Sequence, residues 1–214
     1  MSGKERYALP VISHRPQTTN SATLTITIRH LTHHIKAVLF DLDGTLLDTV
    51  DDLADSMNAA LATLGYPTHP VESYKHFVGN GLSILSRRVL PQGLDTDEHL
   101  VSRCSDLMLS EYELRWSNKT RLYPGISELL TELQLRNLVL NILSNKPHAP
   151  TKKAVDHFLS SWPFRHVDGA KPGVPRKPDP TAATAIARQC GISSSDFLYL
   201  GDTNTDMETA ISAA

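Results

Sequence analysis

Short apolar runs alternate with segments of helical periodicity over most of the chain. Three runs are predicted to be strands: Ala37–Phe40, 138–143 and Phe197–Leu200. The first is entirely apolar, which is typical of a strand buried on both faces of a parallel sheet. The spacing of apolar residues predicts helices over 126–136, 149–159 and 181–189. Strands alternating with helices predict right-handed βαβ units, and hence an α/β fold with a doubly wound parallel sheet.

The stretch between the first two predicted strands has helical periodicity only. Helices are expected over 50–64, 82–90 and 96–116, and no segment of 49–120 has the pattern of a convincing strand. We therefore predict a core made of residues 35–48 and 121–214, into which residues 49–120 are inserted as a helical unit.

Residues 1–34 differ in composition from the rest of the chain. They contain four basic residues against one acidic residue, Glu5, and are rich in Ser and Thr. An organelle transit peptide has this composition, but Leu24, Ile26 and Ile28 alternate as in a strand. A disordered extension, or a start codon assigned too far upstream, is the favoured interpretation. We expect a cytoplasmic protein, or an organellar one if this segment is a transit peptide.

Composition excludes several classes of protein. The chain has 214 residues and a formal net charge of −2, which disfavours binding to nucleic acid through overall charge. Cys104 and Cys190 are too few for a disulfide scaffold or a thiolate zinc site. No apolar run approaches the length of a membrane-spanning helix. We therefore expect neither nucleic-acid nor membrane partners.

Polar residues follow each of the three predicted strands. In a parallel sheet, ligands bind beyond the carboxyl ends of the strands, so these residues are expected to converge. A lysine in a proline-rich loop before a predicted helix joins the set. The candidates are Asp41, Asp43, Ser144, Asn145, Lys177, Asp202 and Asp206.

Four aspartates at one site imply a cation. They cannot all stay ionised close together unless a cation neutralises them, because like charges raise one another's pKa. Ligation by oxygen atoms alone favours a hard ion, and Mg²⁺ also accepts a substrate phosphate. Asp41 and Asp43 are two residues apart, so one can act as nucleophile and the other as proton carrier. Ser144 and Lys177 are donors suited to phosphate oxygens.

Four ordered motifs resemble those of the haloacid dehalogenase superfamily of phosphohydrolases. They are Asp-Leu-Asp-Gly-Thr-Leu-Leu-Asp-Thr at 41–49, Ser-Asn-Lys-Pro at 144–147, Lys-Pro-Asp-Pro at 177–180 and Gly-Asp-Thr-Asn-Thr-Asp at 201–206. The similarity covers residues 35–214. Within the superfamily, Val-Gly-Asn-Gly at 78–81 and the segment 173–178 look like phosphoglycolate phosphatases.

The resemblance implies a Rossmann-like core with an inserted all-helical cap. It implies hydrolysis of a small phosphorylated metabolite, most like 2-phosphoglycolate, through an aspartyl-phosphate. Asp41 would attack phosphorus, and Asp43 would protonate the leaving group and then deprotonate water. The Mg²⁺ cofactor would be held by the Asp41 carboxylate, the Asp43 backbone carbonyl and Asp202, with Asp206 supporting or completing the site.

The remaining candidates would position the substrate. In the resembled family, Ser144 and Lys177 would bind the phosphoryl group, and Asn145 would orient the site. Cap residues Gly79, Asn80, Gly81 and Arg88 are candidates for substrate contact. The alternatives are that Gly79, Asn80 and Gly81 form a simple turn before a helix and that Arg88 is a surface residue. The protein would be a monomer or homodimer.

Other functions remain open at this point. A sugar-phosphate mutase, a pyrophosphatase and a weakly active phosphate-binding relic would share the four motifs. A dehalogenase is disfavoured, because halide displacement does not require the acid–base chemistry of Asp43. A phospho-acceptor signalling domain is disfavoured by the helical insert. The chain ends eight residues after Asp206, which indicates truncation and an exposed edge at Phe197–Leu200.

Overall fold

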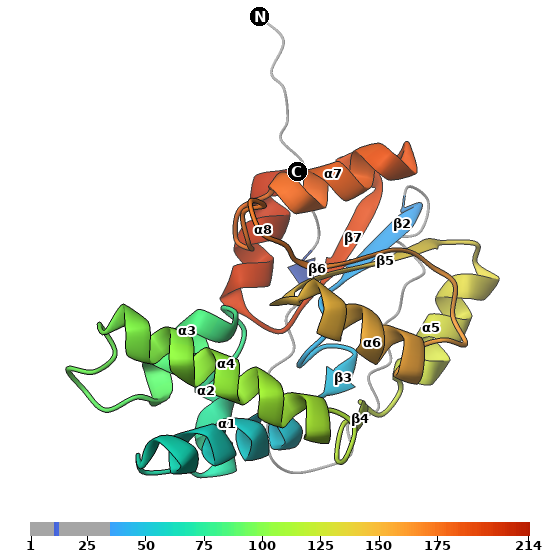
Figure 1. Ribbon diagram of the computed structural model, residues 1–214. Coiled ribbons are helices and arrows are strands. Elements are labelled where there is room, and N and C mark those ends of the chain that lie inside the picture. Colours follow the sequence, from blue (N-terminus) through green and yellow to red (C-terminus); the bar gives the residue numbers. More distant parts are fainter. Residues whose placement is uncertain (1–10, 13–34) are drawn as a thin grey trace, which may run out of the picture.

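The computed structural model describes residues 11–12 and 35–214, and its centre is a parallel sheet (Figure 1). Among these described residues the sheet has five strands, in the order β1-β7-β2-β5-β6, and every neighbouring pair is parallel. The strands are β1 (Val11–Ile12), β2 (Ala37–Phe40), β5 (Val139–Pro147), β6 (Phe164–Ala170) and β7 (Phe197–Leu200). Both β2 and β7 have the bounds expected from their apolar runs.

Helices cover both faces of this sheet. The helices are α5 (Ile126–Leu135), α6 (His148–Phe158), α7 (Thr181–Cys190) and α8 (Asn204–Ala213), and the short 3₁₀ helix η2 (Ser194–Asp196) precedes β7. Val38 and Phe40 pack in one buried cluster with residues of α5 and α6. Ala37 and Leu39 pack in another with residues of α7 and α8. Because alternate residues of β2 enter opposite layers, the predicted doubly wound α/β fold is confirmed.

Four helices lie between the two strands of a small antiparallel sheet. β3 (Leu47–Asp48) pairs with β4 (Arg121–Leu122), so the chain leaves the core and returns at one place. Between them come α1 (Val50–Leu64), α2 (Val71–Phe77), α3 (Leu82–Val89) and α4 (Glu98–Arg115). In Figure 1 these helices form a separate layer beside the sheet.

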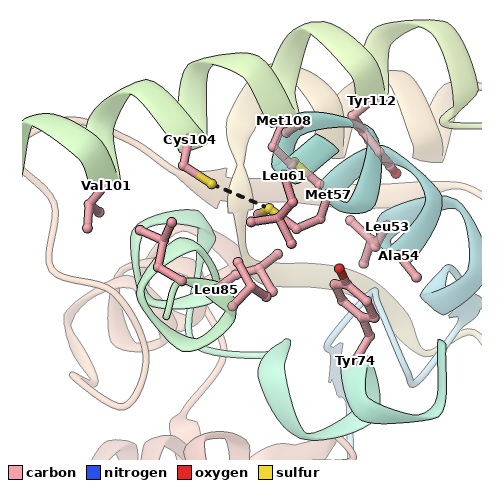
Figure 2. Close-up of a cluster of buried hydrophobic side chains, with 13 residues drawn as sticks. Leu53, Ala54, Met57, Leu61, Tyr74, Leu85, Val101, Cys104, Met108 and Tyr112 are labelled. Carbon is pink, nitrogen blue, oxygen red and sulfur yellow. Dashed lines mark hydrogen bonds between the residues drawn. The ribbon is translucent and has the colours of Figure 1, made fainter. Parts of the chain in front are cut away.

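The helical segment has a buried cluster of its own. Met57 and Leu61 of α1 pack against Tyr74 of α2 and against Cys104 and Met108 of α4, as Figure 2 shows. The Cys104 Sγ atom lies 3.7 Å from the Met57 Sδ atom. This segment therefore buries its apolar residues mainly among its own helices. The division into core and cap at residues 49 and 120 stays a prediction.

Some helices and strands of the structure were not predicted from the sequence pattern. β6 and α2 were not expected, and β5 continues to Pro147 rather than ending at residue 143. β6 is an edge strand with mostly half-buried residues, which explains why it lacks an apolar run. The helix expected from residue 96 begins at Glu98, where Asp97 accepts hydrogen bonds from the backbone N–H groups of His99 and Leu100.

The expectation of an exposed edge at β7 was wrong for two of its residues. Tyr199 and Leu200 pair in parallel with Val11 and Ile12 of β1. The hypotheses for the other residues of 1–34 lie outside the described part of the chain. Within that described part, no helix is both long and apolar enough to cross a membrane.

Candidate active site

Three carboxylates meet where β2 and β7 end. The two strands are neighbours in the sheet, and Phe40 is the register partner of Leu200. Asp41 follows β2 directly, Asp202 lies in the loop after β7, and Asp206 lies in the first turn of α8. One oxygen from each of the three carboxylates lies within 4.8 Å of the corresponding oxygens of the other two. The predicted convergence of these three residues is therefore present.

Lys177 supplies a buried positive charge to this group. Its Nζ atom lies 2.8 Å from Asp41 Oδ1 and 2.5 Å from Asp206 Oδ1. Burial alone would lower the pKa of Lys177, but the neighbouring groups, chiefly Asp41, raise that pKa well above its ordinary value. Lys177 is therefore positively charged in the folded protein.

Asn145 fixes the loop that carries this lysine. Its side-chain oxygen accepts a hydrogen bond of 3.0 Å from the Lys177 N–H, and its Nδ2 atom donates one of 3.1 Å to the Lys177 carbonyl. Asn145 belongs to β5, so the strand sets the position of Lys177 against the carboxylates. Ser144 precedes it on β5 and is buried, and its Oγ atom accepts a 3.2 Å hydrogen bond from the Lys146 N–H.

The electrostatics of the group favour a bound cation. Burial raises the pKa of Asp41 to about 8, with Asp206 and Asp202 adding to the rise and Lys177 opposing it. Burial also raises the pKa of Asp202 to about 6, although a 2.9 Å hydrogen bond from Thr45 lowers it. One lysine thus does not compensate the carboxylates fully. A divalent cation bound to their oxygens would favour the ionised forms.

The oxygen donors and the space around them fit a hard divalent ion. Gly44 has a φ of +88°, and a Cβ atom there would overlap the Asp202 carboxylate. A Cβ atom at Gly201 would likewise overlap Asp206. The Asp206 carboxylate already has three hydrogen-bonding partners, because it accepts hydrogen bonds from Lys177, Tyr199 and Thr203. Asp41 and Asp202 are therefore the freer ligands, and Asp206 is suited to support them.

The Asp43 side chain contacts a different group. Both of its carboxylate oxygens lie 3.2 Å from Lys146 Nζ, and that atom also donates a 2.8 Å hydrogen bond to the Tyr112 hydroxyl. The cluster of three carboxylates does not include the Asp43 side chain. The expected metal contact of Asp43 concerns its backbone carbonyl and stays a prediction.

Of the two partners of Asp43, only Lys146 has a signal in the sequence. Lys146 directly follows Ser144 and Asn145 at the carboxyl end of a strand, where functional side chains gather. Tyr112 is 34 residues away on α4. It lies at helical spacing with the buried residues Cys104 and Met108, so the sequence does not distinguish it from an ordinary core tyrosine.

The loop at 78–81 reaches the same edge of the sheet. The Gly79 carbonyl accepts a 3.2 Å hydrogen bond from Asn145, and Asn80 donates one of 3.0 Å to Thr205. A Cβ atom at Gly81 would lie 2.7 Å from a guanidinium nitrogen of Arg176. These contacts place the predicted cap residues Gly79, Asn80 and Gly81 beside the site.

Arg88 is hydrogen-bonded to this loop and to the end of the helix before it. Its guanidinium donates hydrogen bonds of 2.9 Å to the Phe77 carbonyl and 2.8 Å to the Asn80 side chain. A third, longer bond goes to the His76 carbonyl. The structure therefore ties Arg88 to the backbone before the loop, and substrate contact by Arg88 stays a prediction.

Comparison with known proteins agrees with this geometry. A phosphoglycolate phosphatase of Pseudomonas syringae pv. tomato is 36% identical over 181 residues, which make up 83% of this chain and 66% of that protein. One from Aliivibrio fischeri is 30% identical over 84% of this chain and 81% of its own length. The crystal structure of a predicted phosphoglycolate phosphatase from Haemophilus somnus has a TM-score of 0.78 at 27% identity, covering 84% of this chain and 82% of that one.

The match to a family covers most of the described chain. This chain spans 66% of the length of the Pseudomonas relatives it resembles. The family described as haloacid dehalogenase-like hydrolase matches residues 38–214, which include every candidate site residue. The resemblance indicated by the four motifs is thereby confirmed. The chain belongs to the haloacid dehalogenase-like hydrolase family.

Proposed function

We propose that this protein is a Mg²⁺-dependent phosphatase that hydrolyses a small phosphomonoester, 2-phosphoglycolate, through an aspartyl-phosphate. The observation that carries the proposal is the contact of the buried Lys177 with Asp41, beside a group of oxygens suited to a divalent cation. A carboxylate nucleophile needs positive charge around it when it approaches a phosphate dianion. The names of the relatives supply the substrate class.

The first half-reaction transfers the phosphoryl group to Asp41. One Asp41 oxygen attacks phosphorus, the bond from phosphorus to the ester oxygen breaks, and the departing alkoxide takes a proton from the Asp43 carboxyl. Lys177 and Ser144 hold the phosphoryl oxygens. Mg²⁺ held by Asp41, Asp202 and the Asp43 carbonyl, with Asp206 in support, would supply further positive charge to these oxygens.

The second half-reaction restores the enzyme. Asp43, now a carboxylate, takes a proton from a water molecule as the water oxygen attacks phosphorus. The bond from phosphorus to Asp41 breaks, inorganic phosphate leaves, and both aspartates return to their starting states. The separate surroundings of the two carboxylates support this division of roles, because only the Asp41 side chain belongs to the carboxylate cluster.

The closeness of the helical segment supports a small substrate. The loop at 78–81 hydrogen-bonds to Asn145 and Thr205 directly beside the carboxylates. A phosphomonoester bound there would have its non-phosphate part next to this loop. We further propose a cytoplasmic enzyme, either a monomer or a homodimer, which cell fractionation and size-exclusion chromatography with light scattering would test.

The test is phosphate release from a panel of phosphomonoesters. The panel should contain 2-phosphoglycolate, sugar phosphates and pyrophosphate, each assayed with Mg²⁺, with Ca²⁺ and with EDTA. The proposal predicts the highest kcat/KM for 2-phosphoglycolate, loss of activity in EDTA and better recovery with Mg²⁺ than with Ca²⁺, which accepts more ligands at longer distances. Full activity in EDTA, or a clear preference for pyrophosphate or a sugar phosphate, would contradict it.

A further inference from the structure

Lys146 is a buried charged residue to which the mechanism above gives no role. Its side chain is only 5% exposed, whereas that of its partner Asp43 is 20% exposed. The Lys146 Nζ atom is equidistant, at 3.2 Å, from the two Asp43 oxygens. An ammonium group placed in this way restrains the carboxylate as a whole, and each oxygen keeps lone pairs free for other partners.

The ammonium group is itself held by the helical segment. It donates a 2.8 Å hydrogen bond to the Tyr112 hydroxyl and lies 4.5 Å from the centre of the Tyr112 ring. Tyr112 is buried in α4, within the cluster of Figure 2. Neither Lys146 nor Tyr112 can move far without disturbing well-packed neighbours.

We propose that Lys146 is a positioning residue, which holds the Asp43 carboxyl group where it can exchange a proton with the leaving group, and that Tyr112 fixes Lys146 in turn. This inference rests on the proposed phosphatase function. Asp43 is joined to the helical segment through these two contacts, so the segment contributes to proton transfer as well as contacting the site through the loop at 78–81. The role concerns the location of the carboxyl group, because proton transfer requires approach to hydrogen-bond distance.

This role predicts a dependence on the leaving group. An alkoxide such as that from 2-phosphoglycolate is a poor leaving group and needs the proton from Asp43 as the ester bond breaks. p-Nitrophenolate is stable as an anion and needs no proton. A displaced Asp43 should therefore slow alkyl phosphates selectively. The constant to compare is kcat/KM, because it reports the steps up to release of the leaving group and excludes hydrolysis of the aspartyl-phosphate.

The variants to test are Lys146→Met and Tyr112→Phe, and Lys146→Arg keeps the charge. For Lys146→Met we expect kcat/KM for 2-phosphoglycolate to fall by about 10- to 100-fold, and that for p-nitrophenyl phosphate to change by less than about threefold. Tyr112→Phe should show a smaller effect with the same selectivity. Lys146→Arg should recover part of the activity on 2-phosphoglycolate.

Lys153→Met is the matched control. Lys153 also pairs with a residue of α4, Glu113, at 2.6 Å, and lies 4.7 Å from the centre of the Trp116 ring. It makes these contacts on the surface, with 42% of its side chain exposed. The kcat/KM values of Lys153→Met for both substrates should stay close to those of the wild type.

The outcomes separate the inference from the function on which it rests. Loss of activity confined to the alkyl phosphate supports the positioning role. Equal losses on both substrates, or no loss, would overturn it while leaving the phosphatase proposal intact. If Lys146→Met does not fold, Tyr112→Phe and Lys146→Arg replace it in the test. The quantity compared is again the ratio of kcat/KM for 2-phosphoglycolate to kcat/KM for p-nitrophenyl phosphate. A wild-type protein inactive on both substrates would overturn the proposed function and, with it, this inference.

Discussion

Replacing Lys177 by methionine should destabilise the protein more than any exposed charge deletion. The Lys177 side chain is 3% exposed, and its two partners Asp41 and Asp206 are 9% and 0% exposed. Methionine has nearly the same length and leaves little cavity. The change therefore removes a charge and its hydrogen bonds while largely preserving the packing.

The magnitude follows from the burial of the pair. Above about pH 8, where Asp41 is ionised even without Mg²⁺, removing one partner of this buried ion pair costs about 3–5 kcal/mol, because the remaining charge is left uncompensated. For a chain of this size, about 1 kcal/mol shifts the melting temperature by roughly 2–4 °C, so we expect a fall of about 6–20 °C. Mg²⁺ should raise the melting temperature of Lys177→Met at least as much as that of the wild type, because the carboxylates then lack their lysine.

The assay is thermal unfolding, followed by circular dichroism in EDTA and again in Mg²⁺. The control is Lys153→Met, whose exposed pair with Glu113 is worth about 0–1 kcal/mol. The same preparation should lose phosphatase activity, since Lys177 is proposed to bind the phosphoryl group. If Lys177→Met in EDTA melts as close to the wild-type temperature as Lys153→Met does, the reasoning is refuted.

Three further predictions follow from the carboxylate group. Asp41→Asn should abolish turnover with an unchanged circular dichroism spectrum, because an amide of nearly the same shape is a poor nucleophile; retained turnover would remove Asp41 as nucleophile. Gly44→Ala should weaken Mg²⁺ binding measured by calorimetry, because its Cβ atom would displace Asp202; unchanged affinity would contradict the close approach. Without Mg²⁺, stability measured by urea unfolding should fall as the pH rises from about 4 to about 8. In that range the folded chain retains protons on Asp41 and Asp202, whose pKa values are raised to about 8 and about 6, whereas the unfolded chain has released them at its ordinary pKa of 3.8. A slope of up to about 1.4 kcal/mol per pH unit for each group is expected, and stability that rises over this range would refute the assignment.

Local patterns were enough to predict the central strands and the residues at their ends. Ala37–Phe40 is buried on both faces, and Phe197–Leu200 is buried on one face and half-buried on the other, so both runs are nearly all apolar. Asp41 and Asp202 had to approach each other if those two strands were neighbours, because the carboxyl ends of parallel strands share an edge. The structure confirms that neighbourhood.

What the sequence could not supply depends on contacts between distant segments. β6 is a half-buried edge strand, so its residues show neither a continuous apolar run nor a clean alternation. The pairing of Asp43 with Lys146 and Tyr112 joins three separate elements. Sequence spacing carries no information on such a contact, because helix packing decides which side chain of α4 meets the end of β5.

The most direct test of the account is to identify the phosphorylated residue. The protein should be mixed with 2-phosphoglycolate and Mg²⁺, quenched in acid within one turnover, reduced with borohydride and digested for peptide mass spectrometry. Borohydride converts a phosphorylated aspartate to homoserine. We predict homoserine at position 41 alone, dependent on substrate and absent from Asp41→Asn. Homoserine at position 43, or turnover with no modified aspartate, would contradict the central claim.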